Sequence, residues 1–528
     1  MTGQRRQERT MATAGPQDGT QQTGGQEARR GAFSSRKVFI LAAIGSAVGL
    51  GNIWRFPYVA YENGGGAFVI PYLIALLTAG LPFLFLDYAL GHKHRGSAPL
   101  SMARENRKAE PLGWWQVGIC FVIAVYYAVI IAYALRYTFF SVNKAWGDDP
   151  EGYFFGEFLQ TSDPGVTLDF VAGVLIALLV VWAAVLLIMG LGVQKGIGAT
   201  SVVFIPLLVL AFGFLVVRAL FLPGAADGLD TLFTPDWDAL TNASVWAAAF
   251  GQIFFSLSIG FGIMITYASY VGRRTDMTGS GMVVGLSNSG FELLAGIGVF
   301  AALGFMAQAN GTAVDEVVAD GIGLAFVAFP TIISEAAGGS LIGVLFFGSL
   351  VIAGLTSLIS VLEVVVSAVR DKFDLRRLTA VLVVGVPATV LSVVLFSTTS
   401  GLLVLDIVDY FINQFGILLV AVVTMVVLGL ALRALPGLAA HLNRHGSLRL
   451  GKVWMAMVAV VTPLALGYVL VRAFIDTVKE PYGGYPDWML NVFGWGTAAL
   501  VLIVALVITF ARRTAVTPAD ETDQEVDR

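Results

Sequence analysis

The sequence predicts an all-α polytopic membrane protein. Of its 528 residues 57% are hydrophobic and only 13% are charged, and the mean hydropathy is +0.79. Apolar runs of about 20 residues, the length a helix needs to cross a bilayer, recur along the chain. The single cysteine, Cys120, lies inside one of these runs, so an intramolecular disulfide is excluded.

Twelve apolar runs define the expected transmembrane helices. In chain order they cover residues 38–60, 66–91, 113–146, 167–189, 194–221, 243–271, 280–308, 340–372, 376–398, 403–434, 452–475 and 488–511. Residues 36–434 would form a core of helices 1–10, and residues 435–512 would add helices 11–12. The polar residues 1–35 and the acidic residues 513–528 are expected to be disordered cytoplasmic tails.

The loops between these runs alternate in charge. The loops after spans 2, 6, 10 and 12 are basic and carry Lys93, Arg95, Arg104, Arg107, Lys108, Arg273, Arg274, Arg433, Arg444, Arg449, Lys452, Arg512 and Arg513. The loops after spans 3, 5 and 7 are acidic, as in "GDDPEGYFFGEF". Because basic loops stay inside, both termini are expected in the cytoplasm.

The four histidines (His92, His94, His441 and His445) all fall in the basic loops. A metal site formed by the last two, four residues apart, is conceivable. Solvated loop residues are the favoured interpretation, because no carboxylate or cysteine joins them. The spans contain no Gly-Lys phosphate loop and no Ser/His/Asp grouping, so an enzyme is disfavoured.

Two spans are interrupted by small residues near their middle. Span 1 contains "GSAVGLGNIWRFP" and span 6 contains "FFSLSIGFG". Unpaired backbone at this depth is tolerated only where it is buried in protein or lines a cavity. Paired interruptions predict an inverted repeat, spans 1–5 against 6–10, with a binding site at the breaks. Close helix packing through Gly45 and Gly49 is the alternative, but a second break and the neighbouring Asn52 and Arg55 favour a binding site.

These two stretches resemble the neurotransmitter:sodium symporter family, particularly its bacterial amino-acid transporters. The matching segments are "GSAVGLGNIWRFPYVAYENGGGAFVIPY" and "FFSLSIGFGIMITYASY", followed by "AVYYAV", "LSNSGFELL", "AGLTSLIS" and "LDIVDYF" in other spans. The resemblance extends over about residues 30–510. It implies the leucine-transporter fold, with unwound helices 1 and 6, and sodium-coupled import of an amino acid by alternating access.

The resemblance also implies two sodium sites made of oxygen ligands, which suit a hard cation. The first would use the Ala47 carbonyl and the side chains of Asn52, Ser256 and Asn288, completed by the substrate carboxylate. The second would use the carbonyls of Gly45, Val48 and Ala353 and the hydroxyls of Thr356 and Ser357. Without the motif, hydroxyls bonded to their own helix would be favoured; the motif favours ligation.

The substrate site that the resemblance implies carries no charged side chain. It comprises Ala47, Gly49, Leu50, Gly51, Ile123, Tyr127, Phe255, Ser256, Ser258, Phe261, Ser357 and Val361. The amides of Leu50 and Gly51 and the Tyr127 hydroxyl would hold the carboxylate, and Phe261 would close the pocket as a lid. A charged substrate side chain would be buried without a partner, so we predict a neutral hydrophobic L-amino acid.

Two gates follow from the same match. Arg55 and Asp409 correspond to the extracellular gate, and Asp409 follows Asp406 by three residues on one helix face. Arg30, Phe33 and Asp371 match the intracellular gate, with Tyr270 nearby. In span 5, "GIGATSVVFIP" resembles a segment that unwinds transiently to admit water to the second sodium site; an ordinary proline kink is the alternative.

Glu292 is an acid inside span 7, four residues beyond Asn288. Chloride-dependent relatives have serine here and hold chloride with residues matching Tyr72, Gln252 and Ser256. The carboxylate would substitute for chloride, so chloride-independent transport is expected. Proton counter-transport is a further hypothesis, because a buried carboxyl favours protonation once sodium leaves. A hydrogen-bonded structural acid is the alternative.

Three rival functions remain at this point. An amine carrier would need an aspartate where this chain has Gly49. Another small carboxylated substrate, or a channel or non-transporting sensor on the same fold, is also conceivable, although complete ion sites and two gates favour a transporter. The expected location is the plasma (inner) membrane, with sodium, an amino acid and lipid as partners and no nucleic acid.

Overall fold

The computed structural model describes residues 32–314 and 321–511, and in these ranges the regular secondary structure is helical. Ten of the described helices are long and apolar enough to cross a membrane, and a bent pair makes an eleventh crossing. Two shorter helices, α12 and α13, occupy the position of the predicted span 6 and complete the predicted set. The chain is therefore an all-α, multi-pass membrane protein.

The observed helices follow the predicted spans closely. In chain order they are α2 (Arg36–Ala47), α3 (Leu50–Glu62), α4 (Val69–Ala75), α5 (Leu81–His94), α7 (Glu110–Asn143), α9 (Ala172–Gly190), α10 (Ala199–Leu220), α12 (Ala243–Ser256), α13 (Ile263–Ala268), α14 (Met277–Asn310), α17 (Gly339–Phe373), α18 (Arg377–Phe396), α19 (Gly401–Phe411), α20 (Leu418–Val426), α22 (Lys452–Ala456), α23 (Thr462–Lys479) and α25 (Gly496–Ala511). Single π-helical turns, such as Leu76–Gly80 between α4 and α5, keep several spans continuous.

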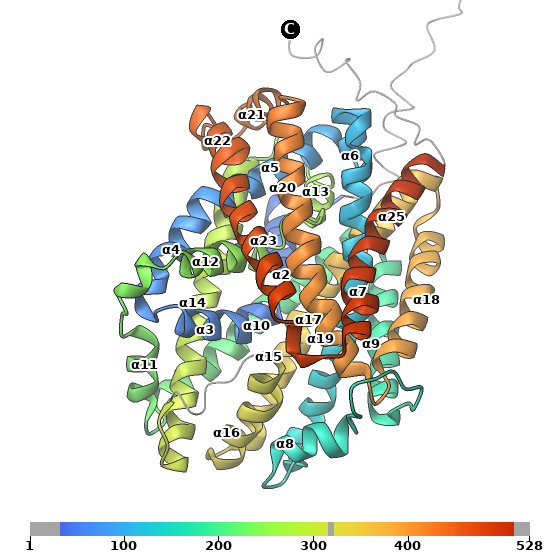
Figure 1. Cartoon of the computed structure of the whole chain (residues 1–528). Helices are drawn as coiled ribbons and strands as arrows, with labels where there is room; N and C mark the ends of the chain where they lie inside the picture. The colour runs from blue at the N-terminus through green and yellow to red at the C-terminus, as the bar shows by residue number, and fades with distance from the viewer. Residues whose placement is uncertain (1–31, 315–320, 512–528) are drawn as a thin grey trace, which may run out of the picture.

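Short helices in the connections mark the two ends of the bundle. Helices α6 (Ala98–Glu105) and α21 (Leu435–Asn443), from the connections after spans 2 and 10, lie at one end. Helices α8 (Pro150–Gly152), α11 (Ala225–Phe233) and α16 (Phe329–Glu335), after spans 3, 5 and 7, lie at the other (Figure 1). The basic and acidic loops are thus segregated, as the charge pattern predicts.

Spans 3 and 8 form the centre of the molecule. Their helices, α7 and α17, make the largest helix–helix contact in the described chain. At one end of these two helices, Lys372 Nζ lies 3.0 Å from Glu110 Oε1, and both side chains are at least 98% buried. Removing one partner of such a buried pair costs about 3–5 kcal/mol. Spans 3 and 8 are the third helices of the two halves, so their pairing agrees with the inverted repeat.

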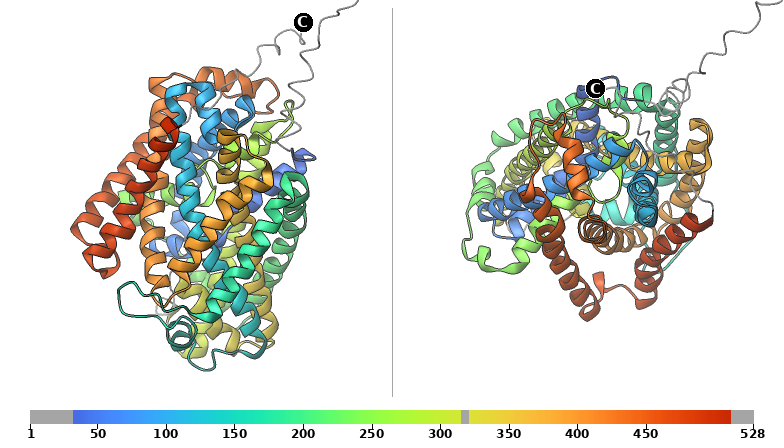
Figure 2. Two further views of the ribbon diagram at one scale, coloured as in Figure 1. Left: turned by 90° about the vertical axis from the view of Figure 1, so that its right-hand side faces the viewer. Right: turned by 90° about the horizontal axis from the view of Figure 1, so that it is seen from above.

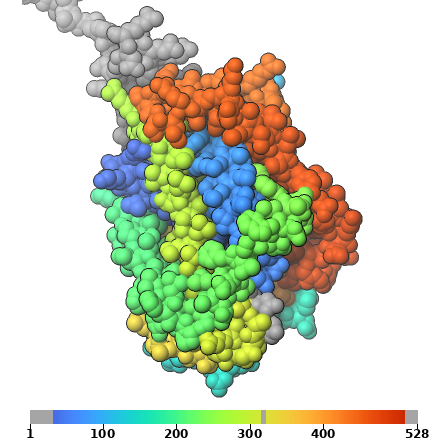
Figure 3. Space-filling model, turned by 90° about the vertical axis from the view of Figure 1, so that its left-hand side faces the viewer, coloured from blue at the N-terminus to red at the C-terminus, as the bar shows by residue number. Residues whose placement is uncertain are grey.

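The last two spans lie outside this core. Seen along the bundle, the red helices α23 and α25 occupy the periphery (Figure 2). On another face, the blue span 2 is visible between the yellow-green α14 and the orange-red span 11 (Figure 3). Helices α23 and α25 present many exposed apolar side chains, among them Leu464, Val471, Val507 and Phe510, which suits contact with lipid.

Candidate functional site

Two breaks in the helices create the site. Helices α2 and α3 are separated by Val48 and Gly49 and bend by 54°. Helices α12 and α13 are separated by residues 257–262, where Ser258, Gly260 and Gly262 have φ values of 52°, 88° and 86°. These left-handed conformations suit glycine and interrupt the helical hydrogen bonds. The helix ends at each break leave backbone N–H and C=O groups available for a ligand inside the bundle.

The residues expected at the first sodium site are hydrogen bonded in a chain. The Asn52 amide donates to Asn288 Oδ1 at 2.8 Å, and the Asn288 amide donates to Ser256 Oγ at 3.1 Å. Asn52 Oδ1 accepts the Gly49 N–H at 2.9 Å, which ties the chain to the break in span 1. The three side chains are at most 2% exposed. The structure therefore gathers amide and hydroxyl oxygens from spans 1, 6 and 7 at one buried point.

The residues expected at the second sodium site also lie together. The Ser357 hydroxyl crosses to span 1 and donates to the carbonyls of Gly45 at 3.4 Å and Ser46 at 3.2 Å. The Thr356 hydroxyl donates to the Ala353 carbonyl within its own helix at 2.9 Å. The expected carbonyl and hydroxyl ligands are thus adjacent, between α2 and α17. Val48, the remaining expected ligand, is the first residue after α2.

The start of α3 forms a cradle at Gly49 and Gly51, which carry no side chain of their own. The Leu50 N–H points at the Tyr127 hydroxyl, 3.3 Å away. A Cβ atom at Gly49 would lie 3.0 Å from Ser357 Oγ and 3.1 Å from the Tyr127 hydroxyl. At Gly51 it would lie 2.2 Å from the Phe255 ring. N–H groups at the start of a helix attract anions, so this cradle suits a carboxylate.

The expected side-chain end of the pocket keeps a small solvent-accessible area in the middle of the bundle. Ile123, Ser258, Phe261, Ser357 and Val361 are 5–7% exposed, although they lie at mid-helix or at the break. No member of this set is charged. It can therefore enclose an apolar group.

The position of the lid corrects one expectation. The Arg55 guanidinium carbon lies 4.4 Å from the centroid of the Phe255 ring. Phe261 lies inside the break, where its carbonyl accepts a hydrogen bond from the Cys120 thiol at 3.0 Å. The ring beneath Arg55, between the cradle and the outer gate, is therefore Phe255 and not Phe261. Phe255 precedes the break and Phe261 lies within it, so their relative positions depend on its backbone path.

The outer gate residues face each other without an ion pair in the described structure. Asp409 accepts hydrogen bonds from Asn413, at 2.8 Å, and from the Tyr126 hydroxyl, while Arg55 lies over Phe255. Arg55, Tyr127 and Phe255 all keep partial exposure. The site is therefore more accessible from this end than from the other.

The inner end is closed by aromatic packing. Phe33 is 7% exposed and contacts the rings of Tyr267 and Tyr270. Its N–H donates to the Tyr270 carbonyl at 3.1 Å. Asp371 accepts the Ser97 N–H at 2.8 Å. Arg30, the expected partner of Asp371, lies outside the described residues.

The inner end also contains residues that the sequence analysis missed. Glu363 on α17 is fully buried and accepts the Tyr270 hydroxyl at 2.6 Å. Arg377 at the start of α18 binds both oxygens of Glu363, at 3.0 and 2.8 Å. Asp87 in span 2 is a second buried acid that was missed. The signal that pointed to Glu292, an acid inside an apolar run, applies to both.

Glu292 lies beside the residues expected at the first sodium site. Its carboxylate accepts a hydrogen bond from Gln252 at 2.7 Å and another from the Tyr72 hydroxyl, which also bonds Ser289 at 2.8 Å. The side chain is completely buried. Tyr72 and Gln252 present donors to one negative group one helical turn from Asn288. This is an arrangement that an anion could share.

Span 5 is continuous in this structure: a π-helical turn at Val193–Gly198 leads into α10, which continues through Pro206, so its transient unwinding stays a prediction. Another expectation differs from the structure. The histidines are not all solvated loop residues, because His92 and His94 are 5% exposed at the end of α5. His92 Nδ1 lies 2.9 Å from His441 Nε2, and burial lowers the pKa of His441 to about 3. Packing of α21 against α5 buries this pair.

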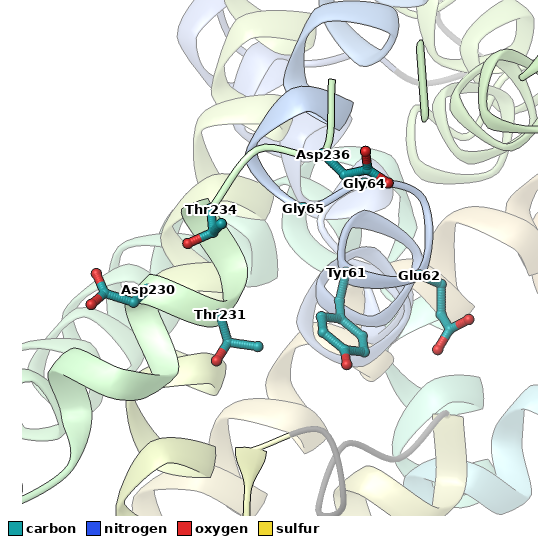
Figure 4. A pocket seen from close by; sticks show the side chains of 8 residues that line it. All are labelled: Tyr61, Glu62, Gly64, Gly65, Asp230, Thr231, Thr234 and Asp236. Carbon is teal, nitrogen blue, oxygen red and sulfur yellow. The ribbon is translucent and has the colours of Figure 1, made fainter. Parts of the chain in front are cut away.

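One open hollow is separate from these residues. It has a volume of about 610 Å³ and lies where α3 meets the α11 connection, lined by Tyr61, Glu62, Gly64, Gly65, Asp230, Thr231, Thr234 and Asp236. Its three carboxylates are spread around the rim and do not point to one spot (Figure 4). The hollow does not show the convergence that an ion site needs.

Comparisons with known proteins agree with this geometry. The Sodium:neurotransmitter symporter family matches residues 30–151 and 145–515. An uncharacterized sodium-dependent transporter of Methanocaldococcus jannaschii is 41% identical over 91% of this chain and 96% of its own length. The human sodium- and chloride-dependent neutral and basic amino acid transporter B(0+) is 30% identical over 88% of this chain and 83% of its own length.

A solved structure is also similar. The crystal structure of MhsT in complex with L-phenylalanine has a TM-score of 0.72 and 32% identity, and it covers 84% of this chain and 100% of that one. The fold with two broken helices is therefore shared with a solved transporter. The chain belongs to the sodium:neurotransmitter symporter family, a family of transporters and not of enzymes, and is a sodium-dependent symporter.

Proposed function

We propose that the protein imports a neutral, hydrophobic L-amino acid together with sodium by alternating access. The cradle at Gly49 carries this proposal, because a side chain there would meet Ser357 and Tyr127 at 3.0–3.1 Å, which disfavours the aspartate of an amine carrier. The N–H groups at the start of α3 favour a carboxylate from the substrate instead. The uncharged pocket lining favours an apolar side chain. The similar protein MhsT was solved with L-phenylalanine, which supports the same class.

Competition for uptake tests the substrate class. In proteoliposomes with an inward sodium gradient, we expect labelled phenylalanine or leucine uptake to be inhibited by aliphatic and aromatic L-amino acids. Glutamate and lysine should compete weakly, since their side chains would be buried without a counter-ion. Tryptamine, which retains the indole and amine but lacks the carboxylate, is the matched control. The proposal is wrong if glutamate, lysine or tryptamine competes best.

We further propose two sodium ions per cycle, bound at the two sets of oxygen ligands. Binding of both ions and the substrate would draw Arg55 and Asp409 together and close the outer side. Loss of the second ion to the cytoplasm would then favour opening of the Phe33 side. Each ion moving down a potential of about 100 mV supplies roughly 2.3 kcal/mol, which can drive uptake against a gradient.

We also propose that transport is independent of chloride, because Glu292 supplies the negative charge near the first sodium site. Glu292→Ser should make uptake depend on chloride, since Tyr72 and Gln252 would then offer their donors to the anion. The measurement is uptake with chloride replaced by gluconate. Glu157→Ser, at an exposed acid in the outer connection, is the control and should stay insensitive to chloride. Unchanged chloride-insensitive uptake by Glu292→Ser would contradict the idea.

Orientation and proton movement complete the proposal. The basic end of the bundle, with α6 and α21, would lie on the cytoplasmic side of the plasma (inner) membrane, together with both termini.

Glu292 would take up a proton when sodium leaves and carry it outward on the return step. In vesicles with the same orientation as the cell, sodium-driven net uptake should therefore make the lumen more alkaline, and this change should be absent in Glu292→Gln.

A further inference from the structure

A pair of tyrosines binds the second carboxylate of span 10. The loop that follows α23 reads "PYGGYP", residues 481–486. The Tyr482 hydroxyl donates to Asp406 Oδ1 at 3.0 Å, and the Tyr485 hydroxyl donates to Asp406 Oδ2 at 2.9 Å. Each oxygen of one carboxylate therefore has its own phenol donor.

The loop is built to hold this geometry. Gly483 and Gly484 have φ values of 64° and 66°, a left-handed turn between two flanking prolines, so the two tyrosines turn back to the same point. The Tyr482 ring also stacks on Tyr410 of α19, with centroids 3.8 Å apart and planes 12° apart. The loop is thus held against α19 by both ring packing and hydrogen bonds.

Asp406 lies close to the proposed outer gate. Asp409 follows it by three residues, so both carboxylates project from the same side of α19 about one turn apart. Asp406 is nearer the start of α19 and therefore nearer the outer surface. Asp409 is bound by Asn413 at 2.8 Å, and Arg55 lies over Phe255 rather than in an ion pair with it. Arg55 therefore makes no ion pair with Asp409 in the described structure, and Asp406 lies about one helical turn from that carboxylate.

We propose that Asp406 is the alternative partner of Arg55 when the outer gate is open. Tyr482 and Tyr485 are positioning residues, whose hydroxyls compete with Arg55 for the Asp406 carboxylate. The inference rests on the gate role of Arg55 and Asp409 proposed above. While the two hydroxyls hold Asp406, Asp409 is the carboxylate left for Arg55, and closure is favoured. Without them, Arg55 pairs with Asp406 about 5 Å further out, one turn of helix, and the gate stays open.

The proposal predicts that the maximal uptake rate and the half-saturating sodium concentration both fall when the two tyrosine hydroxyls are removed. A hydrogen bond to a charged group changes an equilibrium by about tenfold or more. Tyr482→Phe with Tyr485→Phe should therefore lower the maximal uptake rate about tenfold. The half-saturating sodium concentration should fall, not rise, because more of the protein faces outward and is ready to bind sodium. A mere loss of packing would not raise apparent sodium affinity.

Two further variants separate competition from structure. Asp406→Asn, added to the double tyrosine variant, removes the competing charge and should restore most of the rate. Tyr410→Phe is the matched control: it removes the hydroxyl that pairs with Thr477 at 2.7 Å, leaves the ring stack and does not touch Asp406. It should transport like wild type. Tyr485→Phe alone, which also keeps the stack, should show a smaller fall that Asp406→Asn reverses, and it serves if the double variant fails to fold.

The outcomes distinguish this proposal from the gate itself. If Asp409→Asn transports like wild type, the gate assignment fails whatever the tyrosine variants do. If Asp409→Asn is impaired but the tyrosine variants match Tyr410→Phe, only the competition is wrong. The competition is also overturned if adding Asp406→Asn leaves the low rate unchanged, because the tyrosines would then act only through loop structure.

Discussion

Replacing Asn288 with alanine is expected to raise the half-saturating sodium concentration about 10–100-fold, the effect of losing one oxygen ligand of a charged group. Asn288 accepts from Asn52 and donates to Ser256, so the change also leaves two buried polar side chains without that partner. Substrate affinity should fall by a similar factor, because the substrate carboxylate completes the same ion site and coupling between the two ligands is reciprocal.

The measurement is sodium-dependent uptake together with thermal unfolding in sodium or potassium. Sodium should raise the melting temperature of the wild type, because a ligand of the folded state stabilises it, and should raise that of Asn288→Ala only at much higher concentration. Asn242→Ala is the control: it removes an amide that caps α12 in the same span as Ser256 but far along the helix. Uptake by the wild type that is undiminished when potassium replaces sodium would refute the coupling altogether.

Gly49→Asp should abolish uptake of the amino acid, with a loss of at least about 100-fold. The backbone at Gly49 has φ −121° and ψ −166°, which any L-residue can adopt, so the effect does not come from backbone strain. It comes from the added side chain, whose Cβ meets Ser357 and Tyr127 at 3.0–3.1 Å and whose carboxylate lies where the substrate carboxylate is expected. Two carboxylates at one buried point repel each other strongly.

Gly49→Ala separates the two causes. It keeps the steric contact without the charge, so its loss should be substantial but smaller than that of the aspartate. Gly290→Ala, at a position in α14 where an added Cβ meets nothing within 4 Å, should transport normally. Substrate affinity is best measured by binding under saturating sodium. An aspartate variant that still binds the amino acid would place the carboxylate elsewhere in the protein.

Much of the fold could be predicted because the membrane restricts it so strongly. Apolar length gives the spans, and the alternation of loop charge separates the two ends of the bundle. Breaks flanked by polar residues stand out because lipid does not tolerate free backbone. Asn52 and Asn288, in different spans, could be expected together only through the family resemblance. The 2.8 Å hydrogen bond between them agrees with that expectation.

The expectations that the structure corrects depend on the path of irregular backbone and on packing between segments that are distant in the sequence. The order of Phe255 and Phe261 follows from the positive φ angles at Ser258, Gly260 and Gly262, which no periodicity encodes. The burial of His92 depends on α21, which follows it by more than 300 residues. Glu363 is an acid inside an apolar run, which marks it as a candidate, but its partner Arg377 begins the next span, so the sequence did not suggest the pair.

The break in span 6 has a consequence for the biogenesis of the protein. Helix α12 has 14 residues and α13 has six, about 21 and 9 Å long, so neither crosses a hydrocarbon core of about 30 Å. The unwound segment between them would expose backbone N–H and C=O groups to lipid if the span entered the bilayer alone. Its stable insertion therefore requires spans 1, 3 and 8, and span 8 is synthesised only after it. We therefore expect span 6 to stay beside the translocation channel, or in contact with water, until α17 has been synthesised and packs against it.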